Sequence, residues 1–367
     1  MGYLEIKVVQ FNEDGRIKHK ITRRVCVCVC VISHMSICSY NFLILPENLL
    51  LAWETFKNGK RGKKDVQVFE RNLENNIFNL INQLNDQTYR HGSYHAFYVQ
   101  DPKKRHIHKA SVRDRVIHHL LFTALNQLYE PTFIYDSYLC RIDKGTHKGV
   151  ARLAQFARQV SANYSRTCWA LQFDIKQFFA SADHTVLKGL LAKRIADQQT
   201  LWLLYQVIDS FHSDLGEDKG IPLGNLTSQI FANLYLHELD LYVKHTLKSK
   251  YYIRYADDAV ILATSQDQLN KLIPAIQEFL ETRLLLTLHP RKVKVRKLSW
   301  GIDFLGYIVL PGYIVPRTRT KRRILKRIVT TVHDESTNQM VQSYLGYLDH
   351  AHAYHLQVLI EHVTLLT

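Results

Sequence analysis

The sequence predicts an α+β fold in which a small antiparallel sheet is backed by helices. Segments such as 167–179 and the two halves of 251–263 have the alternation and apolar content of strands. Longer segments with apolar residues at helical spacing separate them along the chain. The 367 residues, 46% of them hydrophobic, can form a sizeable core or two to three subdomains. No repeat or clear linker divides the chain into independent domains.

Residues 1–45 are predicted to be an N-terminal extension without an assigned function. The stretch VCVCVCV (25–31) has the strand period, but both of its faces would be apolar. A repeat of the dinucleotide GT encodes alternating Val and Cys in any frame, so low-complexity sequence before a start at Met35 is an alternative. The apolar run is too short to span a membrane and fits a signal peptide poorly. We therefore expect no membrane partner. Six cysteines in a chain of 367 residues do not indicate a disulfide framework, so a reducing, cytoplasmic location is expected.

The first half of the remaining chain is predicted to be mainly helical. Apolar residues recur at helical spacing from Leu49 to Leu84. Residues 94–101 have the pattern of a strand and lead into a basic turn. The segment 111–131 is predicted to be a helix, with Ser111 as its N-cap and Pro131 as its stop signal.

The second half alternates between strands and helices. The segment 167–179 is a predicted strand with Leu171 and Phe173 on one face and Asp174 on the other. The elements predicted after it are, in order, a helical stretch (184–211), a Pro/Gly loop (220–229), a helix to about Lys244, a hairpin (251–263), a helix (267–283), a hairpin turning at Pro311–Gly312, and a helical tail from Thr318.

The chain is strongly basic. Lys and Arg number 48 against 33 Asp and Glu, a net charge of +15. The positive residues gather in four clusters, at 57–64, 103–109, 291–297 and 317–327. A single cluster is typical of a solvated surface, whereas four along one chain are typical of a track for a phosphate backbone. Nucleic acid is therefore the predicted partner, with a basic protein of another role as the alternative.

Three carboxylates stand at the ends of predicted strands. Asp174 closes one strand, and Asp257 and Asp258 occupy the turn of the 251–263 hairpin. If these strands are neighbours, the three side chains converge. Hard carboxylate oxygens suit Mg²⁺, and two such ions stabilise the attacking and leaving oxygens of phosphoryl transfer. An ordinary solvated turn is the alternative for the Asp-Asp pair.

Five motifs, in this order along the chain, resemble those of the reverse transcriptases. They are PKKRHIHKASVRDR (102–115), FDIKQFFASADH (173–184), GIPLGNLTSQIFANLYLHELD (220–240), YADD (255–258) and FLGY (304–307). The resemblance covers about residues 49–356. It implies an RNA-directed DNA polymerase with a right-hand fold, which uses two Mg²⁺ ions, a template RNA, a DNA primer and deoxynucleoside triphosphates. The implied domains are fingers (46–165), palm (166–308, with a helical insertion at 189–222) and thumb (309–367).

The resemblance also implies the roles of single residues at the metal site. Asp174 and Asp257 would hold the metals, with the Ile175 carbonyl as a further ligand and Asp258 as the supporting carboxylate. Lys292 resembles the lysine that acts as a general acid toward pyrophosphate, although its basic neighbours compete for that role.

Further roles concern the incoming nucleotide. Arg105, with Lys103 or Lys104, would bind the triphosphate, and a solvated basic loop is the alternative for this run. Phe179 would exclude a 2′-hydroxyl, with Phe178 as the other candidate. Gly224 and Gln229, in the segment LGNLTSQ, would lie close to the nascent base pair.

The same segment indicates a subtype. Leu223 stands where group II intron enzymes usually carry Gln, and Gln229 where they carry Pro. This departure resembles the diversity-generating retroelement reverse transcriptases, which misincorporate opposite adenine and work with a small basic accessory protein. Two alternatives remain: a group II intron-like or defence-associated enzyme without programmed error, and a catalytically idle RNA-binding relative.

Overall fold

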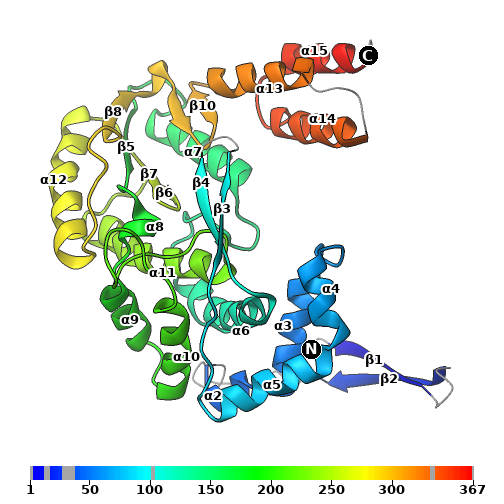
Figure 1. Ribbon diagram of the computed structural model, residues 1–367. Helices are drawn as coiled ribbons and strands as arrows, with labels where there is room; N and C mark the ends of the chain where they lie inside the picture. The colour runs from blue at the N-terminus through cyan, green and yellow to red at the C-terminus, as the bar shows by residue number, and fades with distance from the viewer. Residues whose placement is uncertain (1–2, 12–16, 27–37, 101–103, 331–334, 366–367) are drawn as a thin grey trace.

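The fold was analysed in a computed structural model, which describes residues 3–11, 17–26, 38–100, 104–330 and 335–365 (Figure 1). Its strands form four antiparallel sheets. In sheet order, they are β1 (Tyr3–Phe11) and β2 (Ile17–Cys26); β3 (His95–Val99) and β4 (Arg105–Lys109); β6 (Tyr252–Tyr255), β7 (Asp258–Ala263), β5 (Trp169–Asp174) and β8 (Lys294–Lys297); and β11 (Tyr313–Pro316), β10 (Tyr307–Leu310) and β9 (Ile302–Phe304).

Helices surround these sheets, so the predicted α+β class is confirmed. They are α2 (Tyr40–Leu43), α3 (Pro46–Lys57), α4 (Lys64–Arg71), α5 (Leu73–Asn85), α6 (Val112–Tyr129), α7 (Thr146–Val160), α8 (Phe178–Ser181), α9 (His184–Ala192), α10 (Gln198–Ile208), α11 (Leu226–Leu241), α12 (Gln266–Arg283), α13 (Thr318–Thr330), α14 (Glu335–Leu348) and α15 (Tyr354–Leu365), with short helical turns η1 (Glu130–Thr132), η2 (Tyr242–Thr246) and η3 (Leu298–Trp300).

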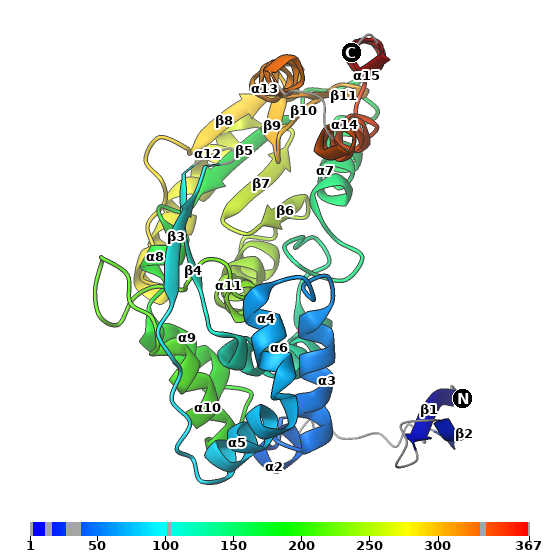
Figure 2. The same ribbon diagram turned by 45° about the vertical axis from the view of Figure 1, so that its right-hand side comes forward.

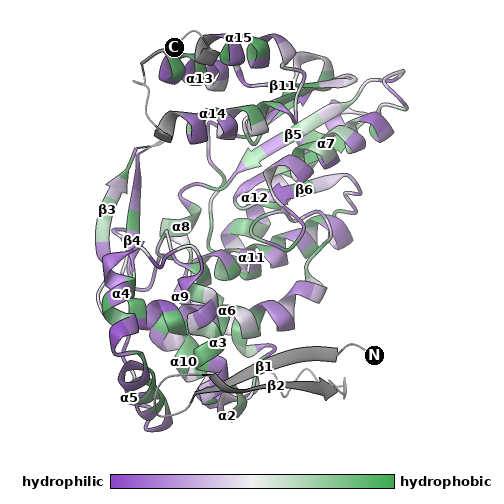
Figure 3. Cartoon of the chain, turned by 90° about the vertical axis from the view of Figure 1, so that its right-hand side faces the viewer, coloured by the Kyte–Doolittle hydropathy of each residue, from purple (hydrophilic) through white to green (hydrophobic). Residues whose placement is uncertain are grey.

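The four-stranded sheet β6-β7-β5-β8, called the central sheet below, is buried on both faces. Leu171 and Phe173 of β5 belong to the main apolar cluster, which also contains residues of α11 and α12. Ala170 of β5 and Val260 of β7 belong to a second cluster with residues of α7, β9 and β10. The alternation in the sequence therefore separates two apolar layers. Figure 3 shows α7 beside the central sheet.

The hairpin β3–β4 extends from the helices toward the C-terminal elements, as Figures 1 and 2 show. All of β3 and the first half of β4 are exposed. The hairpin is fixed at its base, where the His108 amide donates to the Leu223 carbonyl at 2.9 Å and the Asn225 side chain donates to the His108 carbonyl at 2.7 Å. These bonds connect β4 to the loop before α11.

The predicted start of α6 is confirmed. Ser111 is the N-cap, and its hydroxyl accepts from the Asp114 amide at 3.2 Å. The Asp114 carboxylate is fully buried and accepts from the Tyr89 hydroxyl, the Ser111 hydroxyl and the Gly92 amide. This cluster connects α6 to the chain that leads into β3.

Packing against the rest of the protein begins before residue 46, within the predicted N-terminal extension. Tyr40 is almost fully buried, and its hydroxyl donates to the Leu84 carbonyl at 2.7 Å. Residues 3–11 and 17–26 form the hairpin β1–β2, whereas most of the VCVCVCV stretch lies outside the described residues. In the part of the chain that the structure describes, no helix has the length and apolar character needed to cross a membrane.

The C-terminal region begins with the sheet β9–β10–β11. The predicted turn at Pro311–Gly312 is confirmed, and a second tight turn at Leu305–Gly306, within the FLGY motif, adds a third strand. Tyr347 of α14 donates to the Gly306 carbonyl and accepts, through its own carbonyl, from the Tyr307 hydroxyl, both at 2.7 Å. These bonds fix the C-terminal helices to the sheet.

Candidate functional site

The structure brings Asp174 and Asp258 side by side. Asp174 is the last residue of β5 and Asp258 the first of β7, and the two are direct partners in the antiparallel ladder. Asp257 lies in the two-residue turn before β7, after Ala256, which has a left-handed backbone (φ +52°). Asp174 is nearly buried, whereas Asp258 is exposed. The β5–β7 pairing thus explains the proximity that the sequence suggested.

The three carboxylates interact electrostatically. Desolvation, followed by the charges of Asp257 and Asp174, raises the pKa of Asp258 to about 7. Lys292 partly compensates this negative charge, because its ammonium lies 2.7 Å from Asp174 Oδ2. Desolvation alone would lower the pKa of Lys292, but the bond to Asp174 and the nearby carboxylates outweigh it and raise this pKa.

The donors at this place suit a hard divalent cation. They are carboxylate oxygens, and the Ile175 carbonyl is available next to them because Ile175 occupies the non-hydrogen-bonded position of its bridge with Leu288. Among the described residues, no group of three or more His, Cys, Asp or Glu side chains is already arranged as a metal-binding cluster. The chemistry of the donor set fits Mg²⁺, and Lys292 occupies one oxygen of Asp174.

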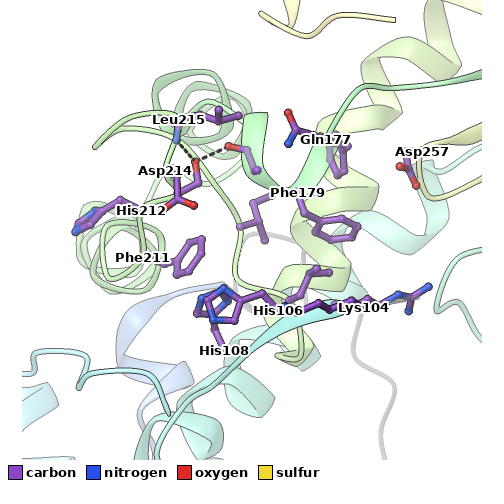
Figure 4. Close-up of a pocket in the computed structure, with 16 residues that line it drawn as sticks. Lys104, His106, His108, Gln177, Phe179, Phe211, His212, Asp214, Leu215 and Asp257 are labelled. Atoms are coloured by element: carbon purple, nitrogen blue, oxygen red, sulfur yellow. Dashed lines mark hydrogen bonds between the residues drawn. The ribbon is translucent and has the colours of Figure 1, made fainter. Parts of the chain in front are cut away.

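A cavity of about 520 Å³ lies beside Asp257 (Figure 4). We call it the loop-side cavity, because the loops after β5 and α10 form much of its wall. This volume is in the range of small-molecule sites. In Figure 4, Asp257 lies at one end and Asp214 at the other, with Phe179 between them. The lining residues are Lys104, Arg105, His106, His108, Gln177, Phe178, Phe179, Ala180, Phe211, His212, Ser213, Asp214, Leu215, Ile221, Leu223 and Asp257.

The two phenylalanines of the FDIKQFF motif have different environments. Phe178 is 1% exposed and packs edge-to-face on Tyr235 of α11. Phe179 is half-buried and forms part of the loop-side cavity wall. Both rings line the loop-side cavity, but Phe179 is the more exposed of the two, whereas Phe178 is almost entirely buried in the core.

Gly224 and Gln229, predicted near the nascent base pair, lie outside the loop-side cavity. Leu223 lines the loop-side cavity, but Gly224 and Gln229 line a different cavity of about 440 Å³ on the other face of β3–β4. We call it the helix-side cavity, because α3, α6 and α11 contribute to it. Gly224 has φ +107°, and a Cβ there would lie 2.7 Å from Ile107 Cγ2, so close packing on β4 explains the glycine.

The helix-side cavity is basic and partly aromatic. Its lining residues are Phe56, Lys60, Phe97, Ile107, Lys109, Arg115, His118, His119, Gly224, Asn225, Leu226 and Gln229. Asp65, outside this lining, accepts from Lys109 at 2.7 Å and from Arg115 at 2.6 Å. Burial, followed by the charges of Lys60 and Arg115, lowers the pKa of His119 to about 4. The charged side chains in this lining are therefore Lys60, Lys109 and Arg115, all of them cations.

Lys292 does not line the loop-side cavity. It contributes instead to a third cavity of about 210 Å³ that includes Asp174, Asp258, Lys294, Arg296 and Arg317. Lys104 and Arg105 do line the loop-side cavity, whereas Lys103 lies outside the described residues.

The sequence prediction missed His106, His108 and Phe211 of the loop-side cavity. His106 and His108 alternate with Ile107 in β4, so the strand period could have placed both on one face. The contact of Phe211 with His108, at 4.6 Å between ring centroids, joins residues about a hundred positions apart. No sequence pattern indicated that contact.

Comparison with known proteins finds a matching family model and several related proteins. The sequence model of the family described as "Reverse transcriptase (RNA-dependent DNA polymerase)" matches residues 100–309. Protein YkfC of Escherichia coli (strain K12) is 23% identical over 274 residues, which cover 65% of this chain and 70% of that protein. The "Uncharacterized 91 kDa protein in cob intron" of Schizosaccharomyces pombe is 30% identical over 152 residues (40% of this chain, 18% of that protein).

A third relative is "Group II intron-encoded protein LtrA" of Lactococcus lactis subsp. cremoris, 25% identical over 223 residues (58% of this chain, 36% of that protein). The chain thus spans 70% of YkfC but much smaller parts of these two intron proteins. Among solved structures, a truncated apo telomerase from Candida tropicalis has 14% identity and a TM-score of 0.41, over 55% of this chain and 44% of that one.

Proposed function

The chain belongs to the reverse transcriptase (RNA-dependent DNA polymerase) family, and on that premise we propose that it copies RNA into DNA with Asp174, Asp257 and Asp258 as its catalytic carboxylates. One observation supports this most. The β5–β7 ladder pairs Asp174 with Asp258, and the turn before β7 places Asp257 next to a cavity large enough for a nucleotide. A solvated turn with no chemical role would not require a paired, nearly buried carboxylate in the adjacent strand.

In this proposal Asp174 and Asp257, with the Ile175 carbonyl, hold two Mg²⁺ ions, and Asp258 supports them. When bound, the ions stabilise the charge on the attacking and leaving oxygens of an in-line phosphoryl transfer. The carboxylates keep the reacting groups in place and compensate the charge of the cations. Lys292, whose ammonium bonds Asp174 on the side of the third cavity, would donate a proton to the leaving pyrophosphate.

The incoming deoxynucleoside triphosphate is proposed to occupy the loop-side cavity. Lys104 and Arg105 supply positive charge for the phosphates at the end of β3–β4. Phe179 lies between that end and the far loop, where its ring can contact the sugar. Because a rigid ring leaves no room for an additional hydroxyl, Phe179 favours deoxynucleotides.

The strands of nucleic acid are proposed to follow the basic surfaces outside this cavity. The helix-side cavity, which includes Gly224 and Gln229, suits the template RNA because its lining is cationic and partly aromatic. The third cavity, with Lys294, Arg296 and Arg317, suits the phosphates of the primer. Residues 46–165, 166–308 and 309–367 would then act as fingers, palm and thumb, with 189–222 as an insertion.

For the subtype, we propose an error-prone enzyme of a diversity-generating retroelement that works with a small basic accessory protein. Leu223 supports this, because an aliphatic side chain lines the loop-side cavity at the place of an amide. A group II intron-like or defence-associated enzyme without programmed error is the alternative. It is favoured by the similarity to the group II intron-encoded protein of Lactococcus lactis.

Primer extension by the purified protein on a defined RNA, followed by sequencing of the product, tests both the polymerase activity and the subtype. We expect Mg²⁺-dependent DNA synthesis with frequent errors opposite adenine. Absence of extension at any Mg²⁺ or Mn²⁺ concentration, while RNA binding is retained, would support the catalytically idle alternative. Extension with few errors at adenine would support the second subtype.

A further inference from the structure

A fully buried arginine lies beneath the Asp257 turn. Arg254, in β6, is 0% exposed. Its Nε donates to Asp240 Oδ1 at 2.6 Å and its Nη2 to Asp240 Oδ2 at 2.5 Å, a two-pronged contact with a carboxylate that is also 0% exposed. Neither the charge pattern nor the resemblance of the sequence to known enzymes assigns a role to this pair.

The same guanidinium reaches the turn itself. Arg254 Nη1 donates to the carbonyl of Ala256 at 3.1 Å, and this carbonyl belongs to the peptide bond that leads into Asp257. Ala256 has φ +52°, a left-handed conformation that is unfavourable for a residue with a Cβ. A strained conformation persists only where its surroundings hold it, and Arg254 provides such a contact.

The pair is itself held from three directions. Asp240 is part of α11, and it also accepts from the Tyr252 hydroxyl at 2.8 Å. Arg254 Nη2 donates to Ser137 Oγ at 3.3 Å, and the Arg254 backbone is bonded to Asp136 and Tyr138. These contacts therefore fix the position of the Ala256 carbonyl relative to α11, to β6 and to the segment 136–138.

Stability alone is a weak reason for this arrangement. Buried ion pairs often contribute no more to folding than apolar side chains of similar volume, because desolvation offsets their attraction. What the planar guanidinium supplies, and an apolar side chain does not, is a set of donors in fixed directions.

We propose that Arg254, oriented by Asp240, is a positioning residue that fixes the Ala256–Asp257 turn so that Asp257 reaches the metal ions together with Asp174. The proposal rests on the proposed function of that site. It predicts that replacing the Arg254 guanidinium displaces Asp257 although every proposed metal ligand is still present.

The test uses the full-length double variant Arg254→Met/Asp240→Leu, which replaces the pair by apolar side chains of similar size. The matched control is Lys188→Met/Asp209→Leu, an ion pair of 2.7 Å that joins α9 to the end of α10 away from the turn. For each protein we would measure the thermal unfolding midpoint, Mn²⁺ binding by electron paramagnetic resonance, and primer extension as a function of Mg²⁺ and of deoxynucleotide.

We expect the double variant to fold, with kcat about 10- to 100-fold lower, as for other small misplacements of a catalytic group. The Mg²⁺ concentration for half-maximal extension should rise and Mn²⁺ binding should weaken, while the KM for deoxynucleotide stays near that of wild type. The control should keep the wild-type metal requirement.

A folded double variant with wild-type Mn²⁺ binding and kcat would overturn the positioning role. If the double variant does not fold, Arg254→Lys tests the positioning role instead, because Lys keeps the positive charge but cannot make the two-pronged contact with Asp240. It should show the same rise in metal requirement, and a wild-type requirement would again overturn the role. Failure of the wild type to extend any primer would refute the proposed function alone, since Mn²⁺ binding would still decide the positioning.

Discussion

The two cavities on either face of the β3–β4 hairpin share a wall but differ in chemistry. The loop-side cavity contains Asp214 and Asp257 together with Lys104 and Arg105, so both signs of charge meet there. The described lining of the helix-side cavity includes cations and histidines and no acid. A site with carboxylates beside cations suits a metal-bound triphosphate, and a cationic, partly aromatic site suits a strand of nucleic acid.

This difference arises from the strand period. Tyr98, His106 and His108 share one face of the hairpin, and Phe97 and Ile107 share the other. The loop docked on the hairpin is divided in the same way, since the adjacent residues Leu223 and Gly224 line opposite cavities. Residues of one motif can thus act on two different ligands.

The largest expected effect comes from removing a carboxylate charge from the loop-side cavity. Asp257→Asn removes a charge from the loop-side cavity alone and should lower kcat for primer extension by about 10²-fold or more, because the metals lose a ligand. RNA affinity, measured by fluorescence anisotropy, should hardly change. Gln229→Ala, on the helix-side cavity, is the control, and an equal loss of kcat from it would break the comparison.

The next effect concerns the sugar of the incoming nucleotide. Phe179→Val shortens the ring in the loop-side cavity and should weaken discrimination against ribonucleotides by about 1–3 kcal/mol, as for other changes of pocket size. The ratio of kcat/KM for a deoxynucleotide and its ribonucleotide measures this. Phe178→Leu, in the core, should leave the ratio unchanged and mainly lower the unfolding midpoint. Unchanged selectivity in Phe179→Val would remove Phe179 from the nucleotide site.

A smaller effect concerns base selection, and it separates Leu223 from Gln229. Leu223→Gln places an amide in the loop-side cavity and should reduce errors opposite template adenine. Gln229→Pro changes the helix-side cavity and should change errors less. Sequencing of products copied from one defined RNA measures both. A larger fall in errors from Gln229→Pro than from Leu223→Gln would mean that the helix-side cavity controls base selection.

The smallest effect tests the strand site. Asp65 compensates Lys109 and Arg115, so Asp65→Asn should expose their charge. We expect RNA affinity to rise by a few-fold at low salt and its dependence on salt to steepen, because each additional phosphate contact adds a slope of about 0.9 or less. Affinity measured over a salt series checks this. The KM for deoxynucleotide should stay constant, and a lower KM would place the triphosphate in the helix-side cavity.

Much of this arrangement follows from local patterns. The strand alternation, the Ser111 N-cap and the turn at Pro311–Gly312 depend on neighbouring residues, and the structure has them as predicted. The carboxylates at strand ends were also predictable, because each ends or begins an apolar run. These features need no knowledge of how distant segments meet.

The parts that could not be predicted depend on docking of distant segments. Gly224 faces the helix-side cavity because its loop bonds to β4, over a hundred residues earlier. Lys292 lies on Asp174 because the segment after α12 returns to the end of β5. The burial of Arg254 is similar, since an arginine in a strand next to two aspartates gives no sign that Asp240 of α11 will enclose it.

The burial of the central sheet implies that its strands open more slowly than the exposed hairpin β3–β4. β5 has a hydrogen-bonded neighbour on each side and an apolar cluster on each face, so its amide hydrogens exchange with solvent mainly when the whole domain unfolds. The exposed hairpin β3–β4 has no such protection and can open locally. We therefore expect Asp174 to be attached to a slowly exchanging segment, and Lys104 and Arg105 to a rapidly exchanging one. If the loop-side cavity binds a nucleotide as proposed, the nucleotide could exchange many times while the carboxylates remain in register.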